Sequence, residues 1–368
     1  MAAVVAHLDL HRQGGYAVRV LAVAALYYGA ARLGLLRRLV VEGSVFTPIW
    51  PPTGVAVAAL LVFGLACWPG VALGAFFAVL SLTSASPDML GFVFGNTAAP
   101  LCAALLLRRT GFRTDLARLR DGLALVFLGA LTAMLVSSTI GVGLLVLTHK
   151  LPAPSFWTVW LAWWVGDAMG VLIVTPLLLL FYKSRWPPPL TRWKEATVLA
   201  VVACCLVPLS TYSSLSLLFL VYPLIIWAAL RFQLAGGMLC ALLTSVLATV
   251  AATDHVGAFA GLNRIEVMAK LQAFNGAMAL TALLLSAVIT EQRNTRRSVE
   301  QACQELVEVL EHLTAGEAPP PRQRTDSDDR PGSHSDRPGS HGDDRRGTDT
   351  DDRPRTDTDD WPRQSGAP

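Results

Sequence analysis

Long apolar stretches, separated by short polar ones, fill the first 290 residues of the chain. A bilayer core about 30 Å thick is crossed by roughly 20 mostly apolar residues in a helix, and a helix satisfies its own backbone hydrogen bonds in lipid. We therefore predict an all-α fold, a polytopic membrane bundle of eight to ten transmembrane helices. Eight predicted spans cover residues 16–36, 90–107, 123–147, 156–182, 196–210, 215–230, 234–252 and 267–290, and two shorter or interrupted ones cover 45–64 and 68–82.

Most basic residues of this part stand in the polar connections, at 108–120, 183–194, 231 and 293–297. Positively charged loops favour the cytoplasmic side, and ten spans put all of these clusters on that side, together with the N-terminal segment 1–15 and the C-terminal end. Arg32, Arg37 and Arg38 then fall on the outer side, against the rule.

The density of charged residues changes sharply near residue 316. The whole chain is 53% hydrophobic and 15% charged, whereas soluble proteins carry about 25% charge. Residues 316–368 hold 9 Arg and 13 Asp or Glu, which leaves 21 Lys or Arg and 14 Asp or Glu for the first 315 residues. Such a tail cannot bury a core and is predicted to be disordered. The expected divisions are 1–15, a membrane domain at 16–292, a helix at 293–315 and the tail at 316–368.

This composition also limits the partners and cofactors. The positive net charge of +3 comes from basic loops, so we expect a lipid bilayer as the partner and no nucleic acid. The six cysteines form no C-x-x-C pair, and five of them lie in or beside apolar segments as small buried residues do. We expect no metal site, no cofactor and no catalytic residue.

Asp167 is the sharpest polar feature of the apolar part. It lies between Gly166 and Gly170, in a segment of Trp, Val, Ala, Met and Leu. A charged side chain at the bilayer centre costs about 2.5–3.5 kcal/mol on insertion scales. Asp167 is therefore either a buried hydrogen-bond partner that fixes helix packing or a contact to a ligand or ion. The Gly166–Gly170 spacing lets another helix approach closely, and Pro176 is expected to kink the same helix.

A proline-rich segment opens the shorter span at 45–64. Pro48, Trp50, Pro51, Pro52 and Gly54 belong to the sequence Thr-Pro-Ile-Trp-Pro-Pro-Thr-Gly. Proline lacks an amide donor and does not fit a helix interior. The segment is either the start of a helix with Trp50 at the membrane interface or a broken helix that lines a cavity.

Four further residues are candidates for polar contacts. Asn96 and Asn275 stand in apolar segments, where hydrogen bonds between helices are the commoner role. Trp164 precedes the Gly-Asp pair, and Arg231 ends an apolar run, where its side chain is expected to reach the cytoplasmic surface.

The predicted helix at 293–315 carries a short apolar seam. Val299, Cys303, Leu306, Leu310 and Leu313 follow a 4-3-4-3 spacing, which is that of the a and d positions of a coiled coil. The seam lasts about two heptads, fewer than the three or four that identify a coiled coil. It is either the stalk of a parallel homodimer or an amphipathic helix on the protein's own loops or on the membrane.

Taken in order, these motifs resemble those of the membrane-associated sensor domain of the first-described MASE type. They are Pro48–Gly54, Trp68-Pro69-Gly70, Gly95-Asn96, Trp164-x-Gly166-Asp167-x-x-Gly170 with Thr175-Pro176, and Pro223–Phe232. The resemblance covers residues 16–293. It implies a bacterial inner-membrane input module, usually fused to a kinase or cyclase, for which no catalysis is attributed to the membrane part.

The resemblance favours one functional hypothesis over two others. No kinase or cyclase motif follows residue 314, so a separate output protein is the expected signalling partner. The alternative is a secondary transporter with Asp167 in the substrate or ion path. A membrane enzyme fits least, because the apolar segments hold no nucleophile–base pair.

Overall fold

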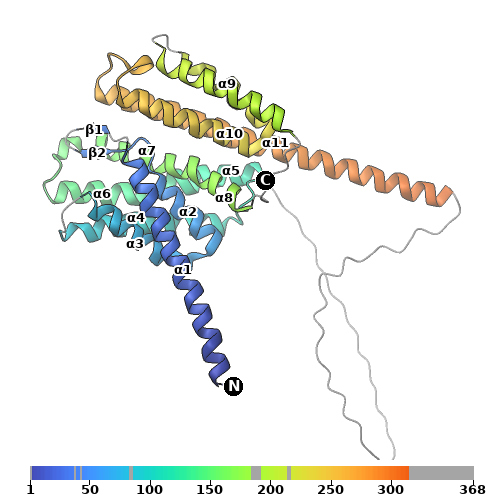
Figure 1. Cartoon of the computed structure of the whole chain (residues 1–368), viewed down its shortest axis with the longest axis horizontal. Coiled ribbons are helices and arrows are strands. Elements are labelled where there is room, and N and C mark those ends of the chain that lie inside the picture. Colours follow the sequence, from blue (N-terminus) through green and yellow to red (C-terminus); the bar gives the residue numbers. More distant parts are fainter. Residues whose placement is uncertain are drawn as a thin grey trace, which may run out of the picture. The chain divides into compact units, whose positions relative to one another are not determined.

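The computed structural model of the chain describes residues 2–36, 39–41, 44–82, 86–183, 192–213 and 217–314 (Figure 1). The predicted tail at 316–368 lies outside them. The described part is almost entirely helical. Its long elements are α1 (Ala2–Gly34), α2 (Pro51–Phe63), α3 (Trp68–Leu80), α4 (Asp88–Arg109), α5 (Leu119–Ala124), α6 (Met134–Leu147), α7 (Phe156–Met169), α8 (Thr175–Lys183), α9 (Trp193–Tyr212), α10 (Val221–Thr253) and α11 (Arg264–Thr314).

Short elements join or extend these helices. Two are π-helical, η2 (Leu125–Thr132) between α5 and α6 and η4 (Gly170–Val174) between α7 and α8. Those of the 3-10 type that lie wholly within the described residues are η1 (Leu65–Cys67), η3 (Ala153–Ser155), η6 (Leu217–Leu220) and η7 (Gly257–Phe259). Two strands rich in β-branched residues, β1 (Leu39–Val41) and β2 (Ser44–Phe46), pair antiparallel with Val40 opposite Val45. The hydropathy pattern did not predict this hairpin.

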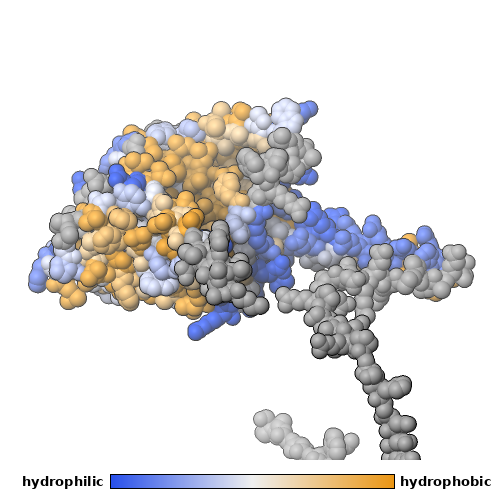
Figure 2. Space-filling view, turned by 60° about the horizontal axis from the view of Figure 1, so that its bottom comes forward, coloured by the Kyte–Doolittle hydropathy of each residue, from blue (hydrophilic) through white to orange (hydrophobic). Residues whose placement is uncertain are grey.

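Seven helical segments of the described chain are long and apolar enough to cross a membrane, and α2 and the η1–α3 segment are shorter apolar helices. Apolar residues cover most of the bundle face seen in Figure 2. Leu26, Phe94 and Trp157 are among the exposed large side chains, at 60%, 64% and 71% of full exposure. Such a surface is suited to lipid rather than water. The chain is a multi-pass membrane protein.

The segment from Leu217 to Thr253 is a helical hairpin rather than one straight span. Gln233 has φ 53° and ψ −138°, which no helical residue adopts. Eight residues of straight helix would separate Ala228 from Gly236 by about 12 Å, but a Cβ on Gly236 would lie 2.6 Å from the Ala228 carbonyl oxygen. The chain therefore reverses at Gln233, between the two spans predicted at 215–230 and 234–252.

Contacts between connections distinguish two ends of the bundle. At the end that we call the basic end, Arg108 donates to the Leu60 carbonyl (2.7 Å), and the Leu119 amide donates to Glu291 (2.8 Å). At the opposite end, Lys150 pairs with Asp88 (2.5 Å). Arg32 belongs to the opposite end, because Gly34 abuts Pro51, where α2 begins, while α2 ends beside Arg108.

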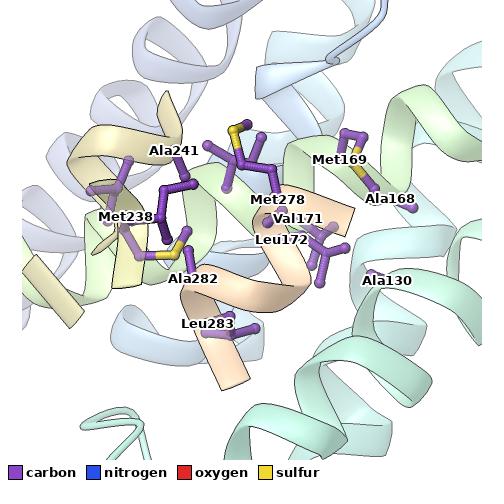
Figure 3. Packing of buried hydrophobic residues seen from close by; sticks show 14 of the residues in the cluster. Ala130, Ala168, Met169, Val171, Leu172, Met238, Ala241, Met278, Ala282 and Leu283 are labelled. Carbon is purple, nitrogen blue, oxygen red and sulfur yellow. The ribbon is translucent and has the colours of Figure 1, made fainter. Parts of the chain in front are cut away.

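The main core joins the central helices to α10 and α11. Met238 and Ala241 of α10 meet Met278, Ala282 and Leu283 of α11, beside Val171 and Leu172 of η4 (Figure 3). A second core cluster packs α1 against α2 and α3 through Val23, Tyr27, Leu60 and Val71. The α7–η4–α8 segment contacts α2 as well as the main core, so it connects the two groups of helices.

Candidate functional site

The proline-rich segment passes the middle of the α7–α8 segment before α2 begins. α2 starts at Pro51, with prolines in its first turn, where a missing amide donor costs nothing. The Trp50 amide, which has no partner in its own helix, donates to the Gly166 carbonyl at 2.9 Å. The segment is thus a helix start, and Trp50 is half-buried against the second core cluster.

Three glycines allow this approach. A Cβ on Gly170 would lie 1.9 Å from the Trp50 carbonyl oxygen, and one on Gly54 would lie 2.2 Å from the Gly170 carbonyl oxygen. A Cβ on Gly166 would lie 2.8 Å from the Thr47 carbonyl oxygen. Backbone meets backbone here without any intervening side chain, which explains why the sequence has glycine at these positions.

Asp167 lies at this contact and is only 1% exposed. Its Oδ2 accepts a hydrogen bond from the Ser137 hydroxyl of α6 at 2.5 Å, while Oδ1 has no hydrogen-bond partner. The Thr53 hydroxyl lies 3.1 Å from the Asp167 carbonyl oxygen and 2.7 Å from that of Trp50. No ion pair in the described part of the chain involves Asp167.

Aromatic side chains surround the carboxylate. Tyr27 of α1 is 1% exposed and faces both the Trp50 indole and Asp167. The Trp163 indole also faces Asp167, and its ring stacks on Phe92 of α4 with centroids 6.2 Å apart. We call Tyr27, Trp50, Thr53, Ser137, Trp163 and Asp167 the Asp167 site; it draws on α1, α2, α6, α7 and the segment before α2.

The contact with α2 continues past η4. The Thr175 hydroxyl donates to the Gly54 carbonyl at 3.1 Å. Pro176 is the second residue of α8 and is buried. A wide π-helical turn, Gly170–Val174, directly precedes α8; π-turns within α-helices often occur at functional sites.

A profile of the MASE1 family matches residues 19–293. The chain belongs to the MASE1 family. The MASE1 domain is also similar to the probable diguanylate cyclase DgcE of Escherichia coli (strain K12), with 27% identity over 222 residues. That alignment covers 56% of this chain and 19% of the relative. No solved structure matches the chain. These comparisons identify the sensor domain and no catalytic domain.

Other predicted residues of the MASE1 domain lie apart from the Asp167 site. The Trp164 indole donates to the Leu131 carbonyl in η2 (2.8 Å), and the Asn96 side-chain amide donates to the Phe92 carbonyl of its own helix (2.9 Å). Asn275 of α11 is fully buried, and neither of its side-chain polar atoms has a partner. Arg231 pairs with Glu195 at the basic end.

The predicted seam lies on the last part of α11. Side chains from Glu291 to Thr314 are almost all exposed, including Val299 at 57%, Leu306 at 63% and Leu313 at 62%. Cys303 and Leu310 are exposed as well. The apolar side chains of the seam are thus exposed to the surroundings of α11, as either a dimer stalk or an amphipathic surface helix would have them.

Sequence reasoning missed Tyr27, Ser137 and Trp163 as members of the Asp167 site. Tyr27 and Ser137 have no distinctive neighbours, since Ser137 is one of several hydroxyl residues in an apolar run. Trp163 adjoins the Trp164-x-Gly166-Asp167 motif, and its place four residues before Asp167, on the same face of a helix, could have indicated it. The described residues include no group of three or more His, Cys, Asp or Glu that could hold a metal ion.

Proposed function

We propose that the MASE1 domain is a signal-input module of the bacterial inner membrane that binds its stimulus at the Asp167 site. The observation that carries this proposal is the Asp167 carboxylate, which is buried without a cationic partner and whose Oδ1 has no close hydrogen bond, with only the Trp163 indole facing the group besides Ser137. Unpaired polar atoms in an apolar interior are costly and call for an explanation, and an ionisable residue inside a membrane segment is by default a candidate functional position. The ligand that fits is one that offers a hydrogen-bond donor or a positive charge to this oxygen.

α7 gives the site a connection to α11. Gln272 of α11 donates to the Ala162 carbonyl of α7 at 3.1 Å, and a Cβ on Gly276 of α11 would lie 3.8 Å from the Met169 side chain. A shift of α7 on ligand binding would therefore move α11. We propose that α11 carries the signal into the cytoplasm, to a homodimer partner through residues 299–313 and to an output protein.

Ligand binding at Asp167 can be tested with a thermal-shift screen of amines, guanidines and other small hydrogen-bond donors on the purified full chain. A compound that stabilises the wild type should lose its effect on Asp167→Asn. Asp115→Asn, which removes a carboxylate in a connection at the basic end, should keep the effect. Equal stabilisation of wild type and Asp167→Asn would show that the compound binds elsewhere.

A separate output protein can be tested by co-purification from bacterial membranes. A kinase or cyclase that is retained by the full chain and lost on deletion of residues 291–313 would support signalling through α11. Retention after this deletion would place the contact on another surface.

Secondary transport is the second candidate function. The observation in its favour is the non-helical backbone at 47–50 beside a buried carboxylate, an arrangement that transporters use for substrate and ion sites. Gradient-coupled flux into proteoliposomes, abolished by Asp167→Asn, would establish transport and exclude a purely sensory role. Ligand binding without flux would exclude transport of that ligand.

A further inference from the structure

A cavity of about 390 Å³ opens between the ends of α1 and α3, away from the Asp167 site. Its lining from α1 and the turn after it includes Gly29, Arg32, Leu33 and Leu36, and Ser81 and Leu82 line it from the end of α3. The volume is in the range of small-ligand sites, which are about 300–1,000 Å³. The lining is mostly aliphatic and contains one cation.

Arg32 is exposed and has no acidic partner among the described residues. One guanidinium nitrogen donates to the Tyr28 hydroxyl at 3.1 Å, and the group lies over the Tyr28 ring, 5.9 Å from its centroid. These contacts hold the side chain without neutralising it, so further N–H groups can donate to a ligand. Guanidinium forms a planar pair of donors that suits phosphate.

With the basic end toward the cytoplasm, the positive-inside rule does not account for this cation. Arg32 lies at the opposite end of the bundle from the basic end, where the positive-inside rule disfavours basic residues. The leucines beside it are open to lipid, with Leu33 at 68% and Leu36 at 74% exposure. A positive group above exposed aliphatic side chains matches an anionic headgroup above its acyl chains.

We propose that the cavity between α1 and α3 binds an anionic phospholipid of the outer leaflet. Arg32 holds the lipid phosphate, and Leu33, Leu36 and Leu82 contact the start of the acyl chains. This site is one helical turn beyond Tyr27 on the same helix, and Gly34 abuts Pro51 and Trp50. A bound lipid would therefore steady the end of α1 beside the segment that enters α2.

Gly29 makes the proposal testable without damaging the fold. A Cβ on Gly29 would have no protein atom within 4 Å, so a leucine there would extend into the open space of the cavity. Gly15 is a matched control, because it lies on the same helix and is equally open. Arg19, an exposed arginine of α1 beyond the cavity, is the control for Arg32.

The test is native mass spectrometry and thermal unfolding of the full chain in detergent, titrated with phosphatidylglycerol, phosphatidylcholine or inorganic phosphate. We expect phosphatidylglycerol to bind and to raise the unfolding temperature, with little effect of the other two. Arg32→Gln should weaken binding about tenfold, the loss of one strong phosphate contact. Gly29→Leu should abolish it, whereas Arg19→Gln and Gly15→Leu should bind as the wild type does.

Three outcomes would overturn the proposal. Binding that survives both Arg32→Gln and Gly29→Leu would place the lipid elsewhere. Equal stabilisation by inorganic phosphate would indicate a site for soluble anions. Equal binding of phosphatidylcholine would remove the role of the negative charge. Because none of these measurements uses a signalling readout, a failure here leaves the proposed function separately testable.

Discussion

The hydrogen bond between Ser137 and Asp167 holds one oxygen of a buried carboxylate whose other oxygen has no partner. Ser137→Ala should lower the free energy of unfolding by about 1–3 kcal/mol, since it removes a hydrogen bond to a charged group. The same change in an Asp167→Asn background should cost less, because the amide forms a weaker bond.

A double-mutant cycle in thermal unfolding measures this coupling. The matched control is Ser138→Ala, whose hydroxyl is also buried but bonds only to carbonyls of its own helix. Additive effects of Ser137→Ala and Asp167→Asn would contradict a direct interaction.

Gln233 occupies a backbone conformation that favours glycine. Residues held in such regions cost of the order of 1–3 kcal/mol. Gln233→Gly should therefore raise the free energy of unfolding, by about 1 kcal/mol after the entropic cost of glycine. Gln233→Val, β-branched, should lower it. Thermal melts of the wild type and the two variants measure these changes in stability. A destabilised glycine variant would show that the Gln233 side chain stabilises the fold by more than its backbone strain costs.

Single residues differ in how far the sequence could predict them. Asp167 could be predicted as buried, because it stands among Trp, Val and Ala in the middle of a long apolar helix. Its partners could not be predicted, since Tyr27, Thr53 and Ser137 come from three other helices and are ordinary residues where they stand. Arg231 was expected to reach the surface, and it pairs there with Glu195, because α9 packs along α10 and brings its first turn beside Arg231.

The contact between α2 and the start of η4 requires backbone-to-backbone packing. Gly170→Ala would push a methyl group to 1.9 Å from the Trp50 carbonyl oxygen. Strain of this kind costs typically 1–3 kcal/mol and sometimes more. Here the nearest neighbour is the Trp50 backbone and the next is the hydrogen-bonded Thr53 hydroxyl, so we expect about 3 kcal/mol or loss of folded protein. Gly143→Ala in α6, with no atom within 4 Å of the added group, should be neutral or slightly stabilising. Expression yield and melting temperature report both, and equal behaviour would argue against the tight contact.

The exposed seam of α11 predicts a parallel dimer. In a coiled coil, Cys303 would face its symmetry mate, whereas Gln301 would point outward. In a variant that retains only Cys303, a mild oxidant in membranes should produce a disulfide-linked dimer. A cysteine at Gln301 in place of Cys303 should crosslink poorly. Monomer at Cys303 under oxidation, or equal crosslinking at both positions, would be inconsistent with this seam.

The positions of the helices were easier to predict from the sequence than the turns and strands that connect them. Hydropathy predicted every long helix, because the requirement of apolar length in lipid is strong. It treated 215–230 and 234–252 as separate spans, which the reversal at Gln233 confirms. Hydropathy did not predict the two strands. It also did not predict the two π-helical segments, because one extra residue in a helical turn does not change the apolar composition.

Successive spans run in opposite directions between the two ends of the bundle, so the orientation of the protein in the membrane can be tested. We expect the basic end to face the cytoplasm, because its loops carry the arginine clusters. In a cysteine-free background, Arg118→Cys should react with an impermeant maleimide only after lysis of spheroplasts. Ala260→Cys, in the connection at the opposite end, should react in intact ones. The reverse result would invert the orientation and place Arg32 inside.

The two core clusters meet along the α7–η4–α8 segment. One contains α1, α2 and α3, and the other contains α10 and α11. Asp167 lies where the first group touches this segment, and Ala162 and Met169 lie where α11 touches it. The sequence could predict neither grouping, because helices that are apolar all round do not reveal their neighbours.

The wide turn of η4 sets the rotational phase of the helix that contains it. The Asp167 carbonyl and the Thr175 hydroxyl both bond to residues of α2. The two residues are eight apart, a spacing that in a plain α-helix would rotate the second by roughly 80° from the first. A spacing of seven would leave them within roughly 20°, and the π-turn absorbs the extra residue. Deleting one residue from Gly170–Val174 would shorten the chain but keep this alignment, with the segment restored to ordinary α-helix. Deleting one residue from α8 beyond Thr175 would leave the alignment intact but turn Lys183 by roughly 100°. The extra residue therefore sets the rotation of α8 relative to α7. Homologous chains that lack this residue should also lack the wide turn while keeping both contacts to α2.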